Sequence, residues 1–445
     1  MLRYVFKNDK KGKVMFMSLF KGPMRMHIRG HKELTEHVDY EKIEAKEKVY
    51  IPLICGKSTD LELFVKENDK VKIGTKLAQS KTPFIVPIYA SVSGKVVGIE
   101  KRMHASVKPI EHLVIENDGK YESVKSFEPL DYKNATREEL IEFMKEAGII
   151  GLGGAGFPSY VKYQNISNIH SVLINAVECE PFITADYKTI FLKKKELLTG
   201  MLAMKKMAEA QRVVIAVKKT HPELITCLKE IVQGYQDIEV VAVPDVYPMG
   251  WERVTVREIF KKEYTTFPRE IGVVVNNVAT AVAFGEALLY GKAIVERMVT
   301  VSGNALKETK NVLVPIGVCV SDVIKAVGGY TDEEVKLIAG GPMMGKTVVN
   351  DQFVIDRFMN ALTVLKTESF QKVACLRCGK CSDYCPAGLQ PVRIAQANKT
   401  KDMDVVKKLC AQDCVECGLC TYICPSRLDV SENVRIAKRQ LELMK

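Results

Sequence analysis

The chain has 445 residues, of which 47% are apolar and 27% charged, and its formal net charge is +11. This length exceeds what one hydrophobic core supports and predicts about three domains, and the composition excludes a disordered or fibrous chain. The excess Lys and Arg occurs in stretches such as "FLKKKELL" (191–198), without an Arg-rich arm or interleaved aromatic residues. We interpret it as solvated surface and predict no nucleic-acid binding; attraction to an acidic carrier protein or an anionic membrane face is the alternative.

The first 48 residues are basic and irregular, and they carry His27, His31 and His37. Gly30 and the mixed polarity of this segment argue against a regular helix that would pair these histidines around a metal ion. The apolar run at the N-terminus is too short for a signal-peptide core, so we expect no export.

Residues 49 to about 119 form short β-rich runs separated by turn residues, which predicts a small all-β unit. Two phrases, "VKENDKVKIGTKLA" and "ASVSGKVV", resemble barrel-sandwich folds of the lipoyl and biotinyl type. The lysine-bearing hairpin tip of those carriers, Met-Lys-Met or Asp-Lys-Ala, is missing. We therefore predict a scaffold domain and not a carrier domain.

A regular alternation of helices and strands begins at residue 136. Thr136 and Glu139 form a predicted capping box for the helix "REELIEFMKEAGI". Buried strand-like runs at 171–177, 212–219, 238–244 and 271–278 are separated by helical stretches, of which "KTIFLKKKELLTGMLAMKKMAEA" is an example. This pattern predicts a parallel sheet with crossover helices.

Two polar phrases follow strands of this sheet, "INAVECEP" and "VVVNNVAT". A ligand of such a sheet binds beyond the carboxyl ends of the strands, so these phrases are candidate ligand-binding loops. The longest apolar tract, residues 271–291, contains Asn276, Asn277 and Glu286 and fits a strand followed by a helix. We therefore predict no membrane span.

A small α+β unit is predicted between about 296 and 350, and a cysteine-rich region with helical segments follows it. That region contains two copies of one pattern, "CLRCGKCSDYC" and "CVECGLCTYIC", each followed by Pro. Three thiolates spaced two residues apart wrap one face of a [4Fe-4S] cluster, and the fourth reaches the other cluster. Structural zinc is the less favoured alternative.

The spacing therefore assigns eight of the 13 cysteines to two clusters. The first cluster takes Cys375, Cys378, Cys381 and Cys424. The second cluster takes Cys414, Cys417, Cys420 and Cys385. Cys410 is outside the register of the second copy, and Cys55, Cys179, Cys227 and Cys319 are isolated, so we interpret these five as small buried side chains.

A glycine-rich stretch, "GLGGAGFPSYVK" (151–162), is the second chemical signal. Four glycines within six residues permit positive φ angles and a close approach of backbone N–H groups to a phosphate. The stretch matches neither the GxGxxG nor the Walker pattern, so by itself it leaves a purely structural turn open.

The order of several motifs resembles one protein family. "GLGGAGFPSYVK", "INAVECEP", "YPMGWE" and "NNVAT" resemble the flavin- and NADH-binding subunit of respiratory complex I. Together with "FKG", "HKELT", "ASVSGKV", "ITADY", "VTVSGNA", "GGPMMG" and both cysteine motifs, they resemble more closely RnfC, the peripheral subunit of the Rnf ferredoxin:NAD oxidoreductase complex. This resemblance covers nearly the whole chain.

The resemblance implies five parts in an α/β multidomain chain. They are an N-terminal basic segment (1–48), a small all-β barrel-sandwich-like domain (49–119), a Rossmann-like FMN- and NADH-binding domain (130–294), an SLBB-like β-grasp domain (296–350) and an α-helical ferredoxin-like domain with two [4Fe-4S] clusters (365–445). The β-grasp domain is expected to serve packing and docking, with small-molecule binding as the alternative.

The resemblance also implies cofactor-binding residues. The FMN is expected on the loop residues Gly153, Gly154, Ala155 and Gly156, with Lys162 reaching its phosphate or ribityl chain and with hydrogen bonds from Asn175, Asn276 and Asn277. Glu178 and Glu180 match acids near the flavin and the NADH ribose, Phe157 matches an aromatic residue stacked on the nicotinamide, and Tyr247, Gly250 and Glu252 match a loop facing the dinucleotide.

The chain departs from the family pattern at three places. Trp251, the only Trp, stands where relatives commonly have a second glycine in "YPxGGE" and complex I relatives have an acid. Val177 replaces an aspartate of the complex I protein. "HIRGHKELT" replaces a proline-containing N-terminal phrase of the family.

The function that the resemblance implies is electron transfer between NAD(H) and FMN and then through two [4Fe-4S] clusters to or from a partner, as the RnfC component of an Rnf complex. No catalytic acid or base is assigned. The implied partners are other Rnf subunits, both membrane-bound and ferredoxin-like, with ferredoxin acting indirectly and the chain peripheral on the cytoplasmic face of a bacterial membrane. The alternatives are a soluble NADH-dependent reductase serving another enzyme, such as a cobalamin reductase or an amino-acid reductase partner, and an electron-wiring subunit without nucleotide binding.

Overall fold

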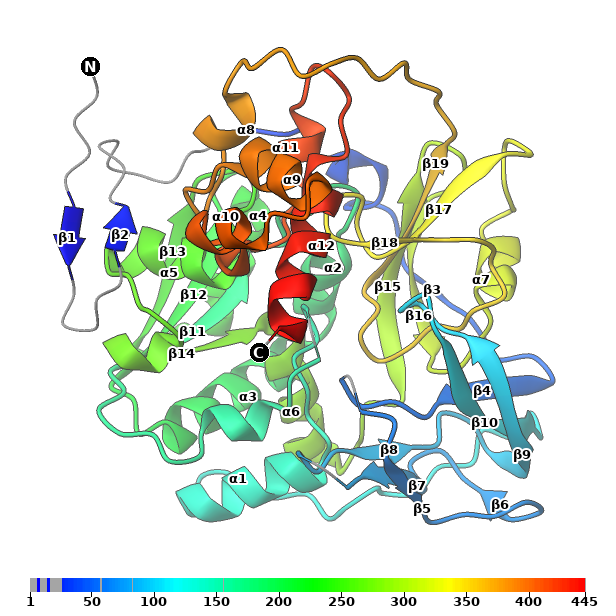
Figure 1. Cartoon of the computed structure of the whole chain (residues 1–445). Coiled ribbons are helices and arrows are strands. Elements are labelled where there is room, and N and C mark those ends of the chain that lie inside the picture. The colour runs from blue at the N-terminus through cyan, green and yellow to red at the C-terminus, as the bar shows by residue number, and fades with distance from the viewer. Residues whose placement is uncertain are drawn as a thin grey trace. The chain divides into compact units, whose positions relative to one another are not determined.

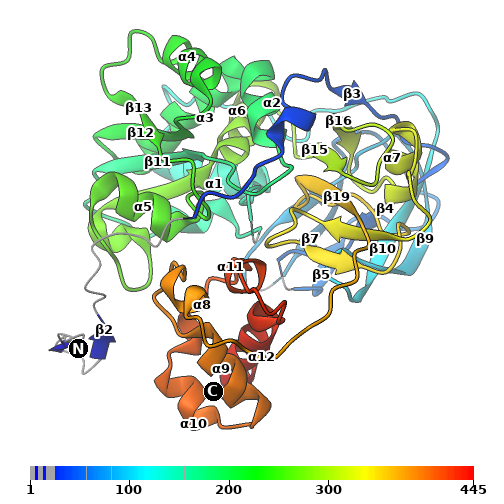
Figure 2. The same ribbon diagram turned by 90° about the horizontal axis from the view of Figure 1, so that it is seen from above.

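A computed structural model describes most of the chain (Figures 1 and 2). The described residues are 6–8, 14–16, 26–56, 58–81, 83–154 and 156–444. They divide into two compact units. The main unit comprises residues 29–245 and 249–367, and the cysteine-rich unit comprises the described residues up to Ile28, Val246–Pro248 and those from Glu368 onward.

The predicted all-β region of the main unit folds as two small antiparallel sheets. Their strands are β4 (Lys48–Pro52), β5 (Leu61–Leu63), β6 (Lys70–Val71), β7 (Lys76–Ser80), β8 (Pro87–Tyr89), β9 (Gly94–Met103) and β10 (Pro109–Asn117). The strand order is β4-β10-β9-β6 in one sheet and β5-β7-β8 in the other. Val49 and Ile115 of the first sheet and Leu77 of the second are fully buried in one hydrophobic core, so the two sheets share an apolar interior as a barrel sandwich requires.

The predicted parallel sheet is confirmed. Its strands are β11 (Ser171–Ala176), β12 (Arg212–Lys218), β13 (Ile238–Val243) and β14 (Val273–Asn277), all parallel, in the order β13-β12-β11-β14. The chain runs outward from β11 to β13 and then returns to β14 on the other side of β11. The carboxyl ends of β11 and β14 therefore flank a topological switch point, where such sheets bind ligands.

Helices surround this sheet (Figure 2). They are α1 (Arg137–Glu146), α2 (Ala185–Leu192), α3 (Lys194–Met207), α4 (Pro222–Ile231), α5 (Glu252–Phe260) and α6 (Val278–Tyr290). The capping box of Thr136 and Glu139 is present at the start of α1, as predicted. The helical stretch predicted from residue 188 onward is divided at Lys193 between the end of α2 and the start of α3.

Helices α3 and α6 pack closely on one another. A Cβ added to Gly200 would lie 1.9 Å from Ala281 O, and one added to Gly285 would lie 1.9 Å from Glu196 O. Glycine is thus required on both helices at this crossing. The contact fixes α6, whose first turn follows directly on β14 at the switch point.

A six-stranded sheet completes the main unit. It contains β15 (Glu296–Gly303), β16 (Lys310–Pro315), β17 (Val335–Ala339), β18 (Lys346–Val348), β19 (Ala361–Lys366) and the short strand β3 (Glu41–Lys42), with helix α7 (Val320–Ala326) after β16. The predicted domain ended at residue 350, but β19 lies inside the sheet between β17 and β15. Parallel pairing with β15 recruits this strand from far along the chain, which a local pattern does not reveal.

The cysteine-rich unit is mainly helical. It contains α8 (Lys380–Asp383), α9 (Pro391–Lys399), α10 (Met403–Lys408), α11 (Leu419–Tyr422) and α12 (Val430–Leu443), and a two-stranded ladder of β1 (Phe6–Asn8) and β2 (Val14–Phe16) is assigned to it. Its core is small and includes the fully buried Ile394, Val406, Ala411 and Ala437. So small a core provides limited hydrophobic stabilisation, and small domains of this kind commonly depend on bound metal.

Candidate functional site

The glycine-rich stretch forms a loop, Gly151–Phe157, beside the carboxyl end of β14. Its base is closed because the Gly151 N–H donates to Phe157 O at 2.8 Å. Gly156 has a φ of +64°, a left-handed conformation that favours glycine. Gly153 and Gly154 are exposed at the tip of the loop. Ala155, which was also predicted to bind FMN, lies outside the described residues.

The back of this loop is packed and its front is open. A Cβ added to Gly153 would lie 2.5 Å from Asn277 Nδ2, and one added to Gly156 would lie 2.0 Å from Phe358 Cε1. A Cβ added to Gly154 would meet no heavy atom of the described residues within 4 Å. The loop therefore presents backbone to open space on one side, as a cradle for a phosphate-bearing ligand requires.

A buried scaffold holds the loop at Leu152. The Leu152 N–H donates to Thr280 Oγ1 at 2.9 Å, and Arg297 Nη2 donates to Leu152 O at 3.2 Å. All three residues are buried. Since both main-chain groups of Leu152 are bound by side chains from α6 and β15, the conformation of the loop depends on tertiary contacts.

Three predicted amide side chains lie at the ends of β11 and β14. Asn175 and Asn277 are paired across these strands, and Asn277 caps α6 by accepting from the Ala279 N–H at 2.9 Å. Asn276 is buried; its Nδ2 donates to Tyr163 Oη at 2.7 Å, but its Oδ1 has no hydrogen-bond partner among the described residues. A buried amide oxygen without a partner costs free energy, and a hydroxyl-bearing ligand would satisfy it.

The predicted basic residue of the site is Lys162. Its Nζ donates to Val275 O at 2.8 Å. Burial lowers the pKa of this ammonium, and the nearby charge of Glu252 opposes that shift. Glu252 begins α5 and accepts a hydrogen bond from Tyr264 Oη at 2.9 Å. Lys162 thus lies beside β14 with its ammonium group bound to a neutral main-chain oxygen. Its positive charge could therefore pair with a phosphate.

The predicted acids, Glu178 and Glu180, follow β11. The Glu178 carboxylate accepts from the Asp186 N–H at 2.8 Å and from the Tyr187 N–H at 3.3 Å, so it caps α2. The Glu180 carboxylate accepts from the N–H groups of Met343 and Met344 at 3.2 and 2.7 Å. Both acids are therefore held in place by backbone donors, and Glu180 is tied to the "GGPMMG" turn of the β-grasp region.

Sequence reasoning assigned no role to Asp186, which interacts with both Glu178 and Asn277. Asp186 is buried and accepts from Asn277 Nδ2 at 2.6 Å. Burial raises the pKa of this carboxyl group, and the charge of Glu178 raises it further. The signal available in the sequence was an acidic residue, in the family phrase "ITADY", at the start of a predicted helix beside a candidate ligand-binding loop.

Three further predicted residues differ in their placement. Phe157 is 41% exposed and contacts Phe84 edge to face, with ring centroids 5.4 Å apart. Gly250 O accepts from Asn175 Nδ2 at 2.7 Å, so the "YPMGWE" segment reaches β11 through Gly250. Tyr247, by contrast, belongs to the cysteine-rich unit; it is buried, and its hydroxyl donates to Cys417 O at 2.6 Å.

The two cysteine motifs have the same local structure. The N–H of Arg377 donates to Cys375 Sγ at 3.4 Å, and the N–H of Glu416 donates to Cys414 Sγ at 3.4 Å. Both donor residues have positive φ angles, of 54° and 57°. Backbone N–H groups directed at the first thiol of each copy stabilise a thiolate there, as iron–sulfur ligation requires.

The thiols of the second predicted cluster interact with one another. Burial raises the pKa of Cys385 and of Cys414, and burial raises the pKa of Cys417 to about 12. The pKa of Cys420 is also raised by burial, with smaller contributions from the charges of Cys417, Cys385, Cys414 and Cys381. Charges of both motifs therefore act on these thiols, and the crossed assignment of Cys385 stays a prediction from the cysteine spacing.

These cysteines fit iron–sulfur clusters. All eight thiols are free. In the part of the chain that the structure describes, no three His, Cys, Asp or Glu side chains gather as a single metal ion requires. The thiolates around a four-iron cluster stand farther apart, because iron and sulfide fill the space between them.

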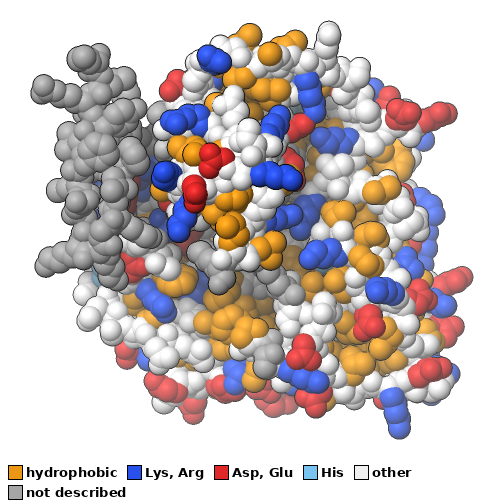
Figure 3. All heavy atoms as spheres, in the orientation of Figure 1, with side chains coloured by type: hydrophobic (Ala, Val, Ile, Leu, Met, Phe, Trp, Pro, Cys, Tyr) orange, Lys and Arg blue, Asp and Glu red, His pale blue; other side chains and the backbone are white. Residues whose placement is uncertain are grey.

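The described surface shows mixed charge. On the face drawn in Figure 3, Lys and Arg side chains are spread among acidic and apolar ones. Among the described residues, no helix has the length and apolar character needed to span a membrane.

Comparisons with known families agree with this geometry. The description "Nuo51 FMN-binding domain" matches residues 144–286, "RnfC Barrel sandwich hybrid domain" matches residues 20–120, and "SLBB domain" matches residues 298–347. The FMN-binding match includes the glycine-rich loop, the sheet with its switch point and most of α6.

Known proteins match over most of the chain. Identity is 33% over 433 residues to the RnfC protein of the Na+-translocating ferredoxin:NAD+ oxidoreductase complex of Acetobacterium woodii, covering 95% of this chain and 97% of that protein. It is 32% over 374 residues to the RnfC protein of the proton-translocating ferredoxin:NAD+ oxidoreductase complex of Clostridium ljungdahlii, covering 82% of each. A solved structure, the NAD+-reducing [NiFe]-hydrogenase in its H2-reduced state, covers 72% of this chain and 64% of its own at 15% identity, but its TM-score of 0.48 supports no statement about the site.

Proposed function

Since the chain belongs to the RnfC family of ion-translocating ferredoxin:NAD+ oxidoreductase complexes, we propose that it carries electrons between NAD(H) and other subunits of such a complex. The chain is an oxidoreductase of the NADH dehydrogenase type. The observation that carries the proposal is the open face of the Gly151–Phe157 loop at the switch point, inside the region that matches an FMN-binding domain.

The proposed cofactors are FMN, NAD(H) and two [4Fe-4S] clusters. When bound, FMN supplies hydride exchange with NAD(H) and single-electron exchange with the clusters. The exposed backbone of Gly153 and Gly154 would receive the FMN phosphate, with Lys162 neutralising its charge. The free Oδ1 of Asn276 would accept from a hydroxyl group of the ligand.

The acids and the aromatic residue orient the dinucleotide in this proposal. Glu178 and Glu180 are fixed by backbone donors, so their carboxylate oxygens keep lone pairs for ribose hydroxyls without moving. Phe157, at 41% exposure, offers a ring face for the nicotinamide. Gly250 and Glu252 lie near these residues, because Asn175 Nδ2 donates to Gly250 O and the charge of Glu252 acts on Lys162. We assign no general acid or base.

The proposed electron path in the cysteine-rich unit uses the crossed thiol sets that the cysteine spacing predicts. Cys385 would ligate the cluster of the second motif and Cys424 the cluster of the first, so that each motif contributes to both. The hydroxyl of Tyr247 donates to Cys417 O within this unit, and we assign Tyr247 to the support of that ligand loop.

The proposed partners are the other subunits of the complex, membrane-bound and ferredoxin-like, with ferredoxin reached only through them. The chain would then be peripheral on the cytoplasmic face of the bacterial membrane. A soluble reductase that serves another enzyme predicts a different result on isolation: the native chain would be recovered from the soluble fraction with that enzyme instead of with membrane subunits.

Anaerobic reconstitution with iron, sulfide and FMN tests the proposal. We expect one FMN-dependent and one cluster-dependent absorbance band, both bleached on titration with NADH. If FMN binds but NADH bleaches neither band, the dehydrogenase proposal fails and an electron-wiring subunit without nucleotide binding takes its place. Trp251, at the start of α5, would then be the first residue to replace by Gly.

A further inference from the structure

A buried lysine from the N-terminal segment binds the loop that carries the predicted acids. Lys32 lies in the short 3-10 helix Lys32–Leu34 and is 8% exposed. Its Nζ donates to Glu178 O at 2.8 Å, to Glu180 O at 2.8 Å and to Ile183 O. An ammonium group has three N–H donors, and here each one meets a main-chain carbonyl of a single loop, Glu178–Ile183.

These hydrogen bonds define the path of the loop. Carbonyl oxygens that point inward at one ammonium group require the backbone to wrap around it, and Glu178 does so with a positive φ of 41°. A non-glycine residue in this region is uncommon and depends on its surroundings to stay there. The carboxylates of Glu178 and Glu180 are bound by backbone N–H donors of other segments, so the ammonium group acts on the main chain of the loop.

The rest of the N-terminal segment holds the same loop from outside. Gly30 O accepts from the Phe182 N–H at 2.7 Å, and the ring of His31 stacks on that of Phe182 with centroids 4.4 Å apart and an interplanar angle of 6°. Thr35 Oγ1 lies 2.7 Å from Thr184 Oγ1. The segment from Gly30 to Thr35 is therefore a clasp on the loop, and Lys32 brings a positive charge into direct contact with the loop backbone.

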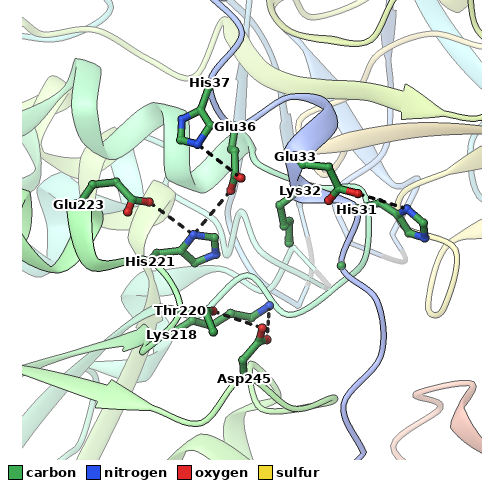
Figure 4. Close-up of a pocket in the computed structure, with 11 residues that line it drawn as sticks. His31, Lys32, Glu33, Glu36, His37, Lys218, Thr220, His221, Glu223 and Asp245 are labelled. Carbon is green, nitrogen blue, oxygen red and sulfur yellow. Dashed lines mark hydrogen bonds and ion pairs between the residues drawn. The ribbon is translucent and has the colours of Figure 1, made fainter.

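The outer side of this clasp lines a polar pocket of about 280 Å³ (Figure 4). The charged side chains on its far wall are already paired, since Lys218 Nζ lies 2.8 Å from Asp245 Oδ1 and His221 Nδ1 lies 3.7 Å from Glu36 Oε2. The buried ammonium of Lys32 is directed instead at the loop.

We propose that Lys32 is a positioning residue for the flavin and nucleotide site, which it serves by holding the Glu178–Ile183 loop through three main-chain carbonyls. The inference rests on the proposed function, because Glu178 and Glu180 are the acids assigned to the ligands. It adds the N-terminal segment, to which sequence reasoning assigned no role in this site, to the parts of the chain that shape the site.

The charge state of Lys32 predicts a pH dependence of ligand binding. Burial lowers its pKa to about 8, against the opposing effect of Glu178. The titratable and charged groups that interact electrostatically with this ammonium group are Glu178, Cys179, Glu180, Asp186, Lys218 and His221. A neutral amine has only two N–H donors, so one carbonyl loses its hydrogen bond when Lys32 deprotonates. Ligand binding should therefore weaken as the pH rises through 8.

The test compares Lys32→Met with Lys46→Met in the reconstituted protein. Lys46 is a matched control, because it is an exposed lysine of the same region in an ion pair with Asp322 at 2.8 Å. We expect Lys32→Met to weaken FMN binding or raise the KM for NADH at least tenfold at pH 7, with the cluster-dependent absorbance band retained. We also expect the parent and Lys46→Met to lose affinity between pH 7 and 9 and Lys32→Met to show no such step.

A second readout follows the loop itself. Amide hydrogen exchange of residues 178–183, in protein without FMN, should be at least tenfold faster in Lys32→Met than in Lys46→Met. If Lys32→Met is not recovered folded, Thr35→Val removes a neighbouring contact and leaves the charge; it should speed exchange in the same residues and keep the pH step. Unchanged exchange and unchanged affinity in these variants would overturn the role of Lys32. Failure of the parent protein to bind FMN or NADH would instead overturn the proposed function.

Discussion

The substitution Gly154→Ala tests whether the glycine-rich loop is a cradle for a ligand or only a structural turn. Gly154 is exposed, its φ is not in the left-handed region, and an added Cβ would meet no heavy atom of the described residues within 4 Å. The folded protein should therefore accept the methyl group with a change in the free energy of unfolding of no more than about 0.5 kcal/mol, as at other open surface positions. The same methyl group would occupy the space that a phosphate must enter to reach the backbone N–H groups.

We expect Gly154→Ala to weaken FMN binding at least about tenfold, which corresponds to roughly 1.4 kcal/mol. Gly156→Ala is the contrasting variant. Its φ of +64° costs a non-glycine residue about 1–2 kcal/mol, and its Cβ would lie 2.0 Å from Phe358 Cε1, so the ring must move. Gly156→Ala should therefore lose both stability and FMN affinity, whereas Gly154→Ala should lose only affinity.

Two assays on the cofactor-free protein measure the stability and the FMN affinity of these variants. Thermal unfolding measures stability, and quenching of FMN fluorescence on titration measures affinity. Gly154→Ala protein that melts with the parent and binds FMN as tightly as the parent would refute the cradle. A melting temperature lowered as far as that of Gly156→Ala would show that the front of the loop is packed and not open.

Three further outcomes are expected. Cys385→Ala should damage the cluster assigned mainly to the second motif in electron paramagnetic resonance spectra, and loss of the other cluster alone would show the crossed assignment to be wrong. Thr280→Val should leave the buried Leu152 N–H without its acceptor at 2.9 Å, lowering the free energy of unfolding by about 1–3 kcal/mol, whereas Thr280→Ser should behave as the parent in the same thermal assay. Burial raises the pKa of Asp186 above 3.8, so its folded carboxyl group binds protons that the unfolded one releases, and stability should fall as the pH rises above that value; Asp186→Asn should remove this fall, and parallel melting curves of variant and parent from pH 4 to pH 7 would contradict it.

Local patterns in the sequence determined the element types of the main unit and the candidate ligands. Buried runs bounded by turns predicted all four strands of the parallel sheet, and Thr136 with Glu139 predicted the start of α1. Glycine spacing and cysteine spacing identified both candidate sites. These features are local, because a turn, a helix cap or the three closely spaced thiolates of one motif depend on residues only a few positions apart.

Tertiary structure alone decided which groups support the site. Thr280 meets Leu152 across 128 positions, and Lys32 meets the carbonyl of Glu180 across 148. The partner in each case is a main-chain atom that every residue has, so no residue type in the sequence marks it. Pairing of β19 with β15 and the assignment of Tyr247 to the cysteine-rich unit depend in the same way on surfaces that meet only after folding. The sequence thus specified the chemical groups and their local geometry, while long-range packing decided which of them hold the loops in place.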